Sequence, residues 1–453
     1  MSVSALNADF VWHERNWREG GNGVGIADGL FAPADAAAEG SHIGRFALPG
    51  MPNLHSHAFQ RAMAGLAERR GPGDDSFWTW RETMYAFAAA LGPDDVKVIA
   101  TQLYIEMLKA GYTQVCEFHY LHHGPGGVRY DDPAAMSLAL IEAARDAGIG
   151  LTLLPVLYMT GGFDGRPLGE RQRRFHHDVG QYVDLLERLK PMEHAMLRIG
   201  IALHSLRAVP PDAMRAVLAT GVAQDMPIHI HIAEQIGEVQ DCLAIRGTTP
   251  VEWLLDNANV DARWTLVHAT HLTGHETQRL ARSGAVAGLC PTTEANLGDG
   301  LFPLADYLDA GGCLGIGSDS HISVSPVEEL RWLEYGQRLV TRHRNIAARH
   351  AGDSVGATLW HAALEGGARA SAQPIGRIES GARADLVVLD DAAPLLAARS
   401  GTDALDSFLF AGNTALVRDV MVGGKWRVRN FSHPRETQAA VDYRRVVERL
   451  AGA

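Results

Sequence analysis

The feature that most constrains the fold is a regular alternation of short apolar runs with longer helical patterns over residues 46–320. Several runs are apolar on both faces, as expected for parallel strands that are covered by helices. The helical patterns at 94–110 and 133–147 each end near a glycine, Gly111 or Gly148, that can cap a helix. The predicted strands are 47–57, 113–120, 151–158, 197–204, 227–234, 264–268, 286–290 and 313–319.

This pattern predicts the α/β class and a closed (β/α)8 TIM-type barrel, which needs eight β/α units over roughly 250 residues. In a closed barrel the first and last strands are neighbours, so His55 and Asp319 would lie next to each other. A doubly wound α/β sheet is the alternative fold, and it would leave these two residues far apart.

The two ends of the chain differ from this central region because they are rich in glycine and in short β-like runs. Examples are 384–389 and 417–422, the second followed by Gly423-Gly424, a plausible hairpin turn. We therefore expect a small β-sandwich domain built from both chain termini. The predicted domains are 1–45 with 375–430 for the small β domain, 46–374 for the barrel and 431–453 for a C-terminal helical tail.

The composition is that of a soluble enzyme, with 46% hydrophobic and 21% charged residues. A net charge of −12 and the lack of basic runs argue against nucleic-acid or anionic-membrane partners, but they permit a small acidic substrate held by local arginines. No apolar run approaches ~18 residues, so no membrane span is expected. Residues 1–9 lack the pattern of a signal peptide, and a cytoplasmic location is expected.

The four cysteines show no metal-binding or redox spacing. Cys116, Cys242, Cys290 and Cys313 are scattered along the chain, without a C-x-x-C pair. We expect four buried, reduced thiols.

His55 and His57 stand near the end of the first predicted strand and form the first candidate metal-binding feature. Side chains alternate along a strand, so residues two apart present both imidazoles on one face. Two neighbouring nitrogen ligands at a strand tip suit a divalent metal ion. The pair alone is a weak signal, and its interpretation depends on the other strand ends.

Further polar residues fall at the ends of later predicted strands. His231 and Glu234 end the fifth strand, His268 ends the sixth, and Asp319 follows small residues at the end of the eighth. Any one of them alone could be a hydrogen-bonded core residue. Together they occupy the end of a barrel at which barrel enzymes carry their active sites. His271 and His275 lack the glutamate of an H-E-x-x-H site and are expected on the surface or in a loop.

Over nearly its whole length the chain resembles the deaminases of the amidohydrolase superfamily. The segment 376–387 also resembles the small β domain of that superfamily. The resemblance implies that His55, His57, His231 and Asp319 are metal ligands and that Glu234, His268 and Asp319 are catalytic. The matching motifs, in order, are Pro52-Asn53-Leu54-His55-Ser56-His57, His231-Ile232-Ala233-Glu234, Val267-His268-Ala269 and Gly317-Ser318-Asp319-Ser320.

The same resemblance bears on the number of metal ions. Binuclear members of the superfamily carry a lysine on the fourth strand, which is carbamylated and bridges two ions. The corresponding segment here, 199–207, contains no lysine. The cofactor expected is therefore one divalent metal ion, with zinc as the favoured element.

Shorter segments are similar to one family within this superfamily, the formimidoylglutamate deiminases. They are 57–61, 77–82, 117–120 and 290–297. That family hydrolyses N-formimino-L-glutamate to N-formyl-L-glutamate and ammonia during histidine degradation. The similarity implies the same activity here, and family resemblance makes a homodimer plausible.

A dicarboxylate substrate requires cations in the pocket, and two arginines are candidates. Arg207 follows the fourth strand and Arg81 lies in the region after the first; a guanidinium group can bind a carboxylate through two hydrogen bonds. The other predicted substrate-binding residues are Tyr120 and His204, as hydrogen-bonding groups, and Gln60, at the formimino end of the substrate.

Two other functions stay open at this point. A related deaminase acting on guanine, another purine or a triazine would share the metal ligands, but would be expected to line its pocket with aromatic and amide groups. A non-catalytic scaffold that kept the barrel would be expected to lack ligands, whereas here all of them are present.

Overall fold

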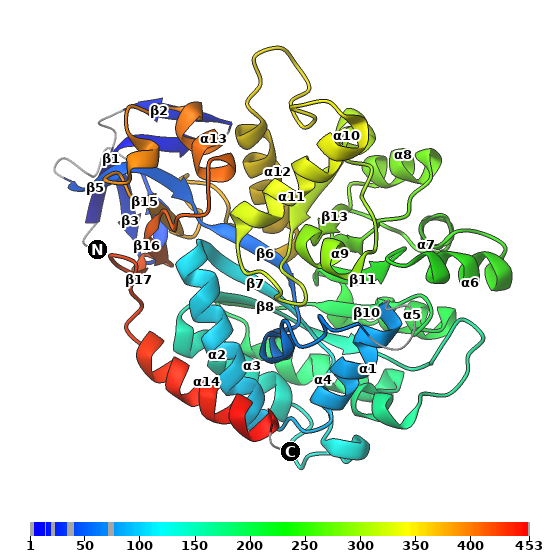
Figure 1. Cartoon of the computed structure of the whole chain (residues 1–453). Coiled ribbons are helices and arrows are strands. Elements are labelled where there is room, and N and C mark those ends of the chain that lie inside the picture. The colour runs from blue at the N-terminus through cyan, green and yellow to red at the C-terminus, as the bar shows by residue number, and fades with distance from the viewer. Residues whose placement is uncertain (1–3, 14, 20–22, 34–39, 71–76, 452–453) are drawn as a thin grey trace.

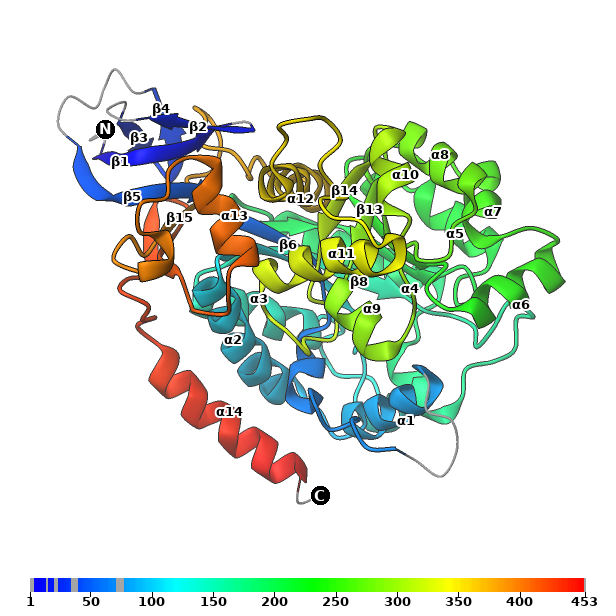
Figure 2. The same cartoon turned by 45° about the horizontal axis from the view of Figure 1, so that its top comes forward.

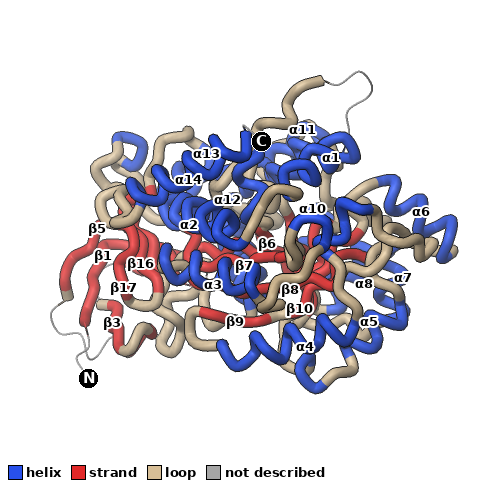
Figure 3. Tube along the Cα trace, turned by 90° about the horizontal axis from the view of Figure 1, so that it is seen from below, coloured by secondary structure: helices blue, strands red, loops and turns tan. Residues whose placement is uncertain are grey.

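The structure is a computed structural model that describes residues 4–13, 15–19, 23–33, 40–70 and 77–451. The outermost residues of the two expected terminal segments, 1–3 and 452–453, lie outside this description. Two sheets organise the described chain, and Figure 3 shows their strands as two separate groups.

The larger sheet is the predicted parallel barrel, surrounded by helices (Figure 1). Its neighbouring strands follow one another along the chain, with β9 (Leu197–Ile199) as a short extra strand beside β8. The barrel strands are β6 (Met51–Ser56), β7 (Tyr112–His119), β8 (Gly150–Leu157), β10 (Ile201–Ser205), β11 (Ile228–Ile232), β12 (Trp264–His268), β13 (Val286–Leu289) and β14 (Cys313–Ile316).

The barrel closes where the chain beyond β14 meets the end of β6. The backbone N–H of Asp319 donates to the carbonyl oxygen of His55 at 3.0 Å, and the N–H of His57 donates to the carbonyl oxygen of Asp319 at 3.2 Å. A parallel bridge between Ser56 and Asp319 lies at the same point. The closed barrel is thus confirmed, and the doubly wound alternative is wrong because the first and last strands are neighbours.

Helix α12 (Val355–Ser371) packs against both strands of this seam, β6 and β14. Its glycines allow a backbone-to-backbone approach: a Cβ atom on Gly366 would lie 1.9 Å from the carbonyl oxygen of Leu314. A Cβ atom on Gly367 would lie 2.7 Å from the Cβ of Pro52. Glycine is therefore required at the point where the helix covers the closed barrel.

The predicted helices at 94–110 and 133–147 are α2 (Pro93–Ala110) and α3 (Ala135–Ala147). Gly111 and Gly148 cap them in the left-handed conformation, as predicted. The further helices around the barrel are α1 (Phe77–Ala88), α4 (Val179–Leu189), α5 (Pro211–Leu218), α6 (Ile236–Arg246), α7 (Pro250–Asn257), α8 (Gly274–Ser283), α9 (Pro291–Leu297), α10 (Leu304–Asp309) and α11 (Pro326–Thr341).

The smaller sheet combines strands from both ends of the chain, as predicted, and forms one mixed sheet beside the barrel (Figure 2). Strands β1 and β5 are parallel, and their other neighbours are antiparallel. Helix α13 (Thr402–Phe410) lies near this sheet, whereas α14 (Glu436–Ala451) packs against α2 of the barrel. The strands are β1 (Ser4–His13), β2 (Asn16–Glu19), β3 (Val24–Ala27), β4 (Leu30–Ala32), β5 (Ser41–Pro49), β15 (Leu386–Leu389), β16 (Val417–Val422) and β17 (Lys425–Val428).

Two predicted strands are divided in the structure. The run 47–57 belongs to both sheets: residues 47–49 pair with β15 as the end of β5, and β6 begins after Gly50. The run 197–204 is split at Gly200 into β9 and β10. In both runs apolar residues stand on each side of the dividing glycine, so hydrophobicity alone does not mark the point at which the chain leaves one partner strand for the next.

The cysteine prediction needs one correction. All four cysteines are free, and Cys116, Cys242 and Cys290 are buried as expected. Cys313 is only partly buried, because it begins β14 at the rim of the barrel. Within the described residues, no helix is long and apolar enough to cross a membrane.

The contact of α12 with β14 predicts opposite effects for two glycine-to-alanine substitutions. Gly366→Ala places a methyl group against the Leu314 backbone and should lower the free energy of unfolding by about 1–3 kcal/mol or more. Gly237→Ala, in α6 with nothing near its Cβ position, should raise it by about 0.5–1 kcal/mol. Urea unfolding measures both values, and equal stability of Gly366→Ala and the wild type would contradict the packing described here.

Candidate metal centre and active site

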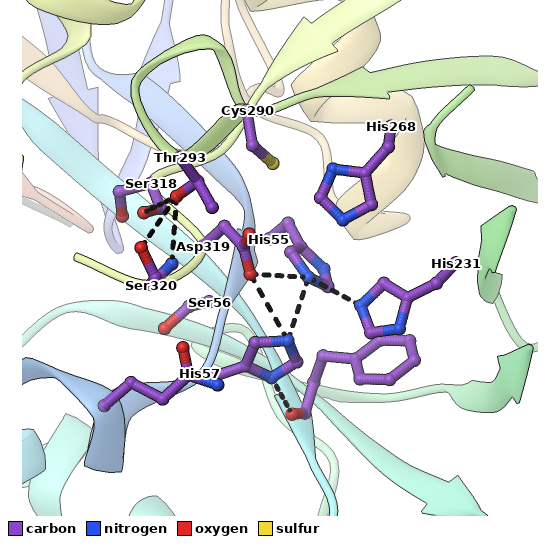
Figure 4. A network of polar contacts seen from close by, with 12 residues as sticks. His55, Ser56, His57, His231, His268, Cys290, Thr293, Ser318, Asp319 and Ser320 are labelled. Carbon is purple, nitrogen blue, oxygen red and sulfur yellow. Dashed lines mark hydrogen bonds and ion pairs between the residues drawn. The ribbon is translucent and has the colours of Figure 1, made fainter. Parts of the chain in front are cut away.

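Four ligand atoms from three separate barrel strands converge at the seam (Figure 4). The Nε2 atom of His55 lies 3.2 Å from Nε2 of His57 and 3.0 Å from Nε2 of His231. The Oδ1 atom of Asp319 lies 3.3 Å from Nε2 of both His55 and His57. Ligands of a tetrahedral zinc ion are separated by about 3.4 Å when each bond is ~2.1 Å. The ligand atoms of His55, His57 and Asp319 thus lie within 4.8 Å of one another, a grouping that could hold a metal ion. His231 joins this group through its contact with His55, and its ligand atom is also grouped with those of His55 and His268.

The imidazoles of this cluster are held in the neutral form that metal binding requires. Burial lowers the pKa of His55 to about 3 and also lowers the pKa values of His57 and His231. The Nδ1 atom of His57 lies 2.8 Å from the carbonyl oxygen of Phe118, to which it can only donate. Its Nε2 lone pair therefore faces the cluster, an arrangement that is common among metal-binding histidines with a backbone partner.

Asp319 stays ionised within the same cluster. Burial acts to raise its pKa, but the hydrogen bond with His55 and the surrounding imidazoles, of which His268 is positively charged, outweigh burial and hold the pKa below its usual value. A carboxylate at this point can bind a cation and can also accept a proton.

Buried polar side chains fix the turn that presents Asp319. The amide oxygen of Asn53 accepts the backbone N–H of Ser318 at 3.1 Å and that of His55 at 3.3 Å, so one side chain bridges β6 and the residues after β14. On the other side, Thr293 of α9 accepts the backbone N–H of Ser320 at 3.2 Å. These contacts surround the seam and fix the position of Asp319 relative to His55.

Backbone strain is concentrated at the same end of the barrel. Ala233, His268, Ala269 and Asp319 all have positive φ angles, between 44° and 70°. Side-chain-bearing residues rarely adopt this conformation, and it persists where the surrounding structure enforces it. Ala233 follows β11, His268 ends β12 and Ala269 comes next, and Asp319 follows β14. These turns direct the side chains of His268 and Asp319 toward the cluster (Figure 4).

The predicted catalytic pair lies beside the ligand cluster. Nε2 of His268 is 3.9 Å from Oε1 of Glu234. Burial raises the pKa of Glu234 to about 7, against the opposing effect of His268. Burial acts to lower the pKa of His268, but Glu234, Glu294 and Asp319 together raise it to about 10. Glu234 can therefore take up and release a proton near neutral pH, while His268 carries a positive charge.

A pocket with a cavity volume of about 50 Å³ opens onto these residues. All five predicted substrate-binding residues line it together with His57, His231, Glu234, His268 and Asp319. Arg81 comes from α1, Gln60 from the short helix Ala58–Met63, and Tyr120 follows β7, with Nε2 of Gln60 donating to its hydroxyl at 2.8 Å. His204 is on β10, and Arg207 follows it. One pocket thus combines two guanidinium groups with the candidate metal centre.

Sequence reasoning assigned no role to two groups of residues at this site. Glu294, quoted only as part of a motif, lies 3.3 Å from Nδ1 of His268 through its Oε1 atom. A set of aromatic pocket residues was not singled out because nothing in their spacing separates them from core aromatics: Trp80, Tyr85, Tyr158 and Phe175.

Other histidines lie outside the cluster. His229 shares a strand face with His231 but lies two residues earlier on β11. Its Nε2 contacts the carbonyl oxygen of Ala370 at 2.9 Å. His275 is exposed and pairs with Glu252, as expected for a surface residue. His271 is partly buried in the loop after β12.

Comparisons with known proteins identify relatives over nearly the full chain. The model of the amidohydrolase family matches residues 46–427. A formimidoylglutamate deiminase of Pseudomonas aeruginosa is 55% identical over 452 residues, which are 99% of this chain and 100% of the relative. A 5-methylthioadenosine/S-adenosylhomocysteine deaminase of Natronomonas pharaonis is 27% identical, over 87% of this chain and 85% of the relative. The crystal structure of an amidohydrolase from Brucella melitensis superimposes with a TM-score of 0.92 and 43% identity, covering 99% of this chain and 100% of that one.

The bridging position of Asn53 predicts that its removal weakens metal binding. Asn53→Ala leaves the buried N–H groups of His55 and Ser318 without their acceptor and should lower metal affinity about 10- to 100-fold. The affinity is measured by competition with a chromophoric chelator.

Gln114→Ala is the matched control. This side chain is an equally buried amide near the start of β7, where it contacts Thr152 and Arg383. Its loss should lower stability and leave metal affinity unchanged. Wild-type affinity in Asn53→Ala would show that the bridge does not position the ligands.

Proposed function

The chain belongs to the amidohydrolase family, and from this premise we propose that it hydrolyses N-formimino-L-glutamate to N-formyl-L-glutamate and ammonia. The supporting observation is that one pocket holds Arg81 and Arg207 together with the convergent ligand atoms and the pair Glu234 and His268. The similarity to the formimidoylglutamate deiminase of Pseudomonas aeruginosa points to the same substrate.

We propose one zinc ion as the cofactor, held by His55, His57, His231 and Asp319. Three imidazoles and one carboxylate suit zinc, and the fourth-strand segment 199–207 has no lysine that could bridge a second ion. When bound, the ion supplies Lewis-acid activation of water and of the formimino group at neutral pH.

The protein side chains then manage the protons of the reaction. Asp319, ionised and next to the centre, accepts a proton from the attacking water as the new C–O bond forms at the formimino carbon. Glu234, with a pKa of about 7, delivers a proton to the formimino nitrogen as the C–O bond forms and takes up the hydroxyl proton as the formyl carbonyl forms. Asp319 returns its proton to the departing nitrogen, so that the C–N bond breaks with release of neutral ammonia. The positively charged His268 stabilises the negative charge that develops on the attacking oxygen.

The substrate carboxylates are assigned to the arginines of the pocket. Burial acts to lower the pKa of Arg207, but the nearby side chains, including Tyr158 and Glu238, outweigh it and raise this pKa, so the arginine that lines the pocket stays charged. Arg81 lies over the ring of Tyr85, with 5.4 Å between Cζ and the ring centroid. The amide oxygen of Gln60 is buried and unpaired among the described residues, and we assign it to the formimino nitrogen.

A second candidate function is that of another zinc aminohydrolase, acting on a purine or a triazine. The aromatic residues Trp80, Tyr85, Tyr158 and Phe175 in the pocket favour it, because aromatic rings stack on flat heterocycles. Ammonia release from N-formimino-L-glutamate, guanine, adenosine and a triazine separates the two functions. We expect turnover of N-formimino-L-glutamate; turnover of a heterocycle alone would replace the proposal by the alternative.

The homodimer and the cytoplasmic location inferred from the sequence stay predictions.

Substitution of Glu234 tests the proton transfer. Glu234→Gln keeps the size and hydrogen-bonding capacity of the side chain but cannot carry a proton, so kcat should fall roughly 10²- to 10⁴-fold. Metal content should be unchanged. Glu276→Gln, a buried carboxyl that caps α8 outside the pocket, is the control and should keep near-normal kcat. Near-normal turnover by metal-loaded Glu234→Gln would remove Glu234 from the mechanism.

Substitution of Arg207 tests the recognition of a carboxylate. Arg207→Met should raise KM for N-formimino-L-glutamate about 10- to 100-fold, because the substrate loses the binding energy of a charge-assisted hydrogen bond. The effect on kcat should be smaller. Arg246→Met is the control, because Arg246 donates to the nearby carbonyl oxygen of Leu206 from outside the pocket. An unchanged KM in Arg207→Met, with wild-type metal content, would show that Arg207 does not bind the substrate.

A further inference from the structure

His268 has a carboxylate on each side of its ring. On the pocket side, its Nε2 is 3.9 Å from Glu234. On the far side, its Nδ1 is 3.3 Å from Oε1 of Glu294. Glu294 is buried and is not among the described residues that line the pocket, so its closest link to the reacting groups is its contact with His268.

The backbone fixes the orientation of the Glu294 carboxyl group. Glu294 is on α9, the short helix that follows β13, and the N–H of Cys290 donates to its Oε1 at 2.9 Å. A backbone N–H can only donate, so this oxygen must be an acceptor. Because Nδ1 of His268 contacts the same oxygen, that nitrogen must carry a proton.

Two observations indicate that His268 needs such a support. Its backbone is in the left-handed region, with φ at 70°, a conformation that a histidine does not hold without help from its surroundings. Its side chain is almost fully buried, so solvent cannot fix the orientation of the ring. A carboxyl group on Nδ1 supplies this orientation, as outer carboxylates do for other functional histidines.

We propose that Glu294 is a positioning residue: it holds the Nδ1–H of His268 so that Nε2 faces Glu234 and the reacting group. The proposal rests on the proposed function, in which His268 stabilises the transition state. It extends that function by a residue that touches neither substrate nor metal ion. The oxygen of Glu294 that accepts both hydrogen bonds is the atom through which it acts.

Two variants of Glu294 distinguish the effect of its hydrogen-bond acceptor from the effect of its negative charge. Glu294→Met removes the acceptor at similar volume and should lower kcat about 10- to 100-fold, with KM and metal content close to wild type. In Glu294→Gln the Cys290 N–H keeps the amide oxygen in place as an acceptor. This variant should keep kcat within about tenfold of wild type, because its amide oxygen can still accept the hydrogen bond from Nδ1–H of His268.

The double variant Glu294→Met with His268→Gln tests whether Glu294 acts through His268. Two residues that act as a unit are non-additive, so Glu294→Met should cost little further activity in the His268→Gln background. An equal loss in both backgrounds would overturn the proposal in favour of a general structural role. Glu329→Gln is the matched control and should keep wild-type kcat: this buried carboxyl also accepts a backbone N–H from the start of α9, that of Thr292 at 2.9 Å, but it does not line the pocket.

A spectroscopic test does not depend on turnover. In ¹⁵N-histidine NMR spectra of the metal-loaded protein, a slowly exchanging Nδ1–H signal that disappears in His268→Gln belongs to His268. We expect it to be lost in Glu294→Met and kept in Glu294→Gln, even if the wild type does not hydrolyse N-formimino-L-glutamate. Its survival in Glu294→Met would overturn the proposal.

Metal analysis tests whether Glu294 is instead a metal ligand. Ligand atoms of His268, Cys290 and Glu294 lie within 4.8 Å of one another and could themselves hold an ion. Loss of one metal equivalent in Glu294→Met would make Glu294 a ligand and would also overturn the proposal.

Discussion

Two backbone hydrogen bonds at the barrel seam, between Asp319 and the pair His55 and His57, determine the geometry of the whole site. They join the first and last barrel strands and bring together residues from opposite ends of the barrel sequence. The candidate metal ligands follow from this geometry, because the side chains of these three residues point to one centre and His231 contacts His55 from β11. The glycines of α12 and the amide of Asn53 support the same seam from outside and from within.

Burial then divides the titratable residues into two groups. The imidazoles of His55, His57 and His231 have few charged partners to offset desolvation and stay neutral, as ligands must. His268 lies beside three carboxylates and becomes positively charged. Glu234, buried near Asp319 and Glu238, keeps a pKa close to neutrality. Similar burial thus yields ligands, a cation and a proton carrier, depending on which charges lie within a few ångströms.

Much of this arrangement could be predicted from the sequence. Continuous apolar runs separated by capped helices indicate a parallel barrel, and strand order then places His55, His231, His268 and Asp319 at one end. The strand boundary at Gly50 could not be found, because apolar residues continue through it from one sheet into the next. Nor could the contact of Glu294 with His268, since a glutamate on the short helix after β13 meets the end of β12 only in the folded barrel. Side-chain networks that join distant segments leave no periodic signal.

The central claim is that this seam assembles a centre for one metal ion next to a pocket for an acidic formimino substrate. A crystal structure of the zinc-loaded protein with a non-hydrolysable mimic of N-formimino-L-glutamate tests it most directly. The account predicts one anomalous peak among His55, His57, His231 and Asp319, the formimino carbon beside Glu234 and His268, and the carboxylates on Arg81 and Arg207. A metal ion bound elsewhere, or a mimic whose carboxylates point away from both arginines, would contradict it.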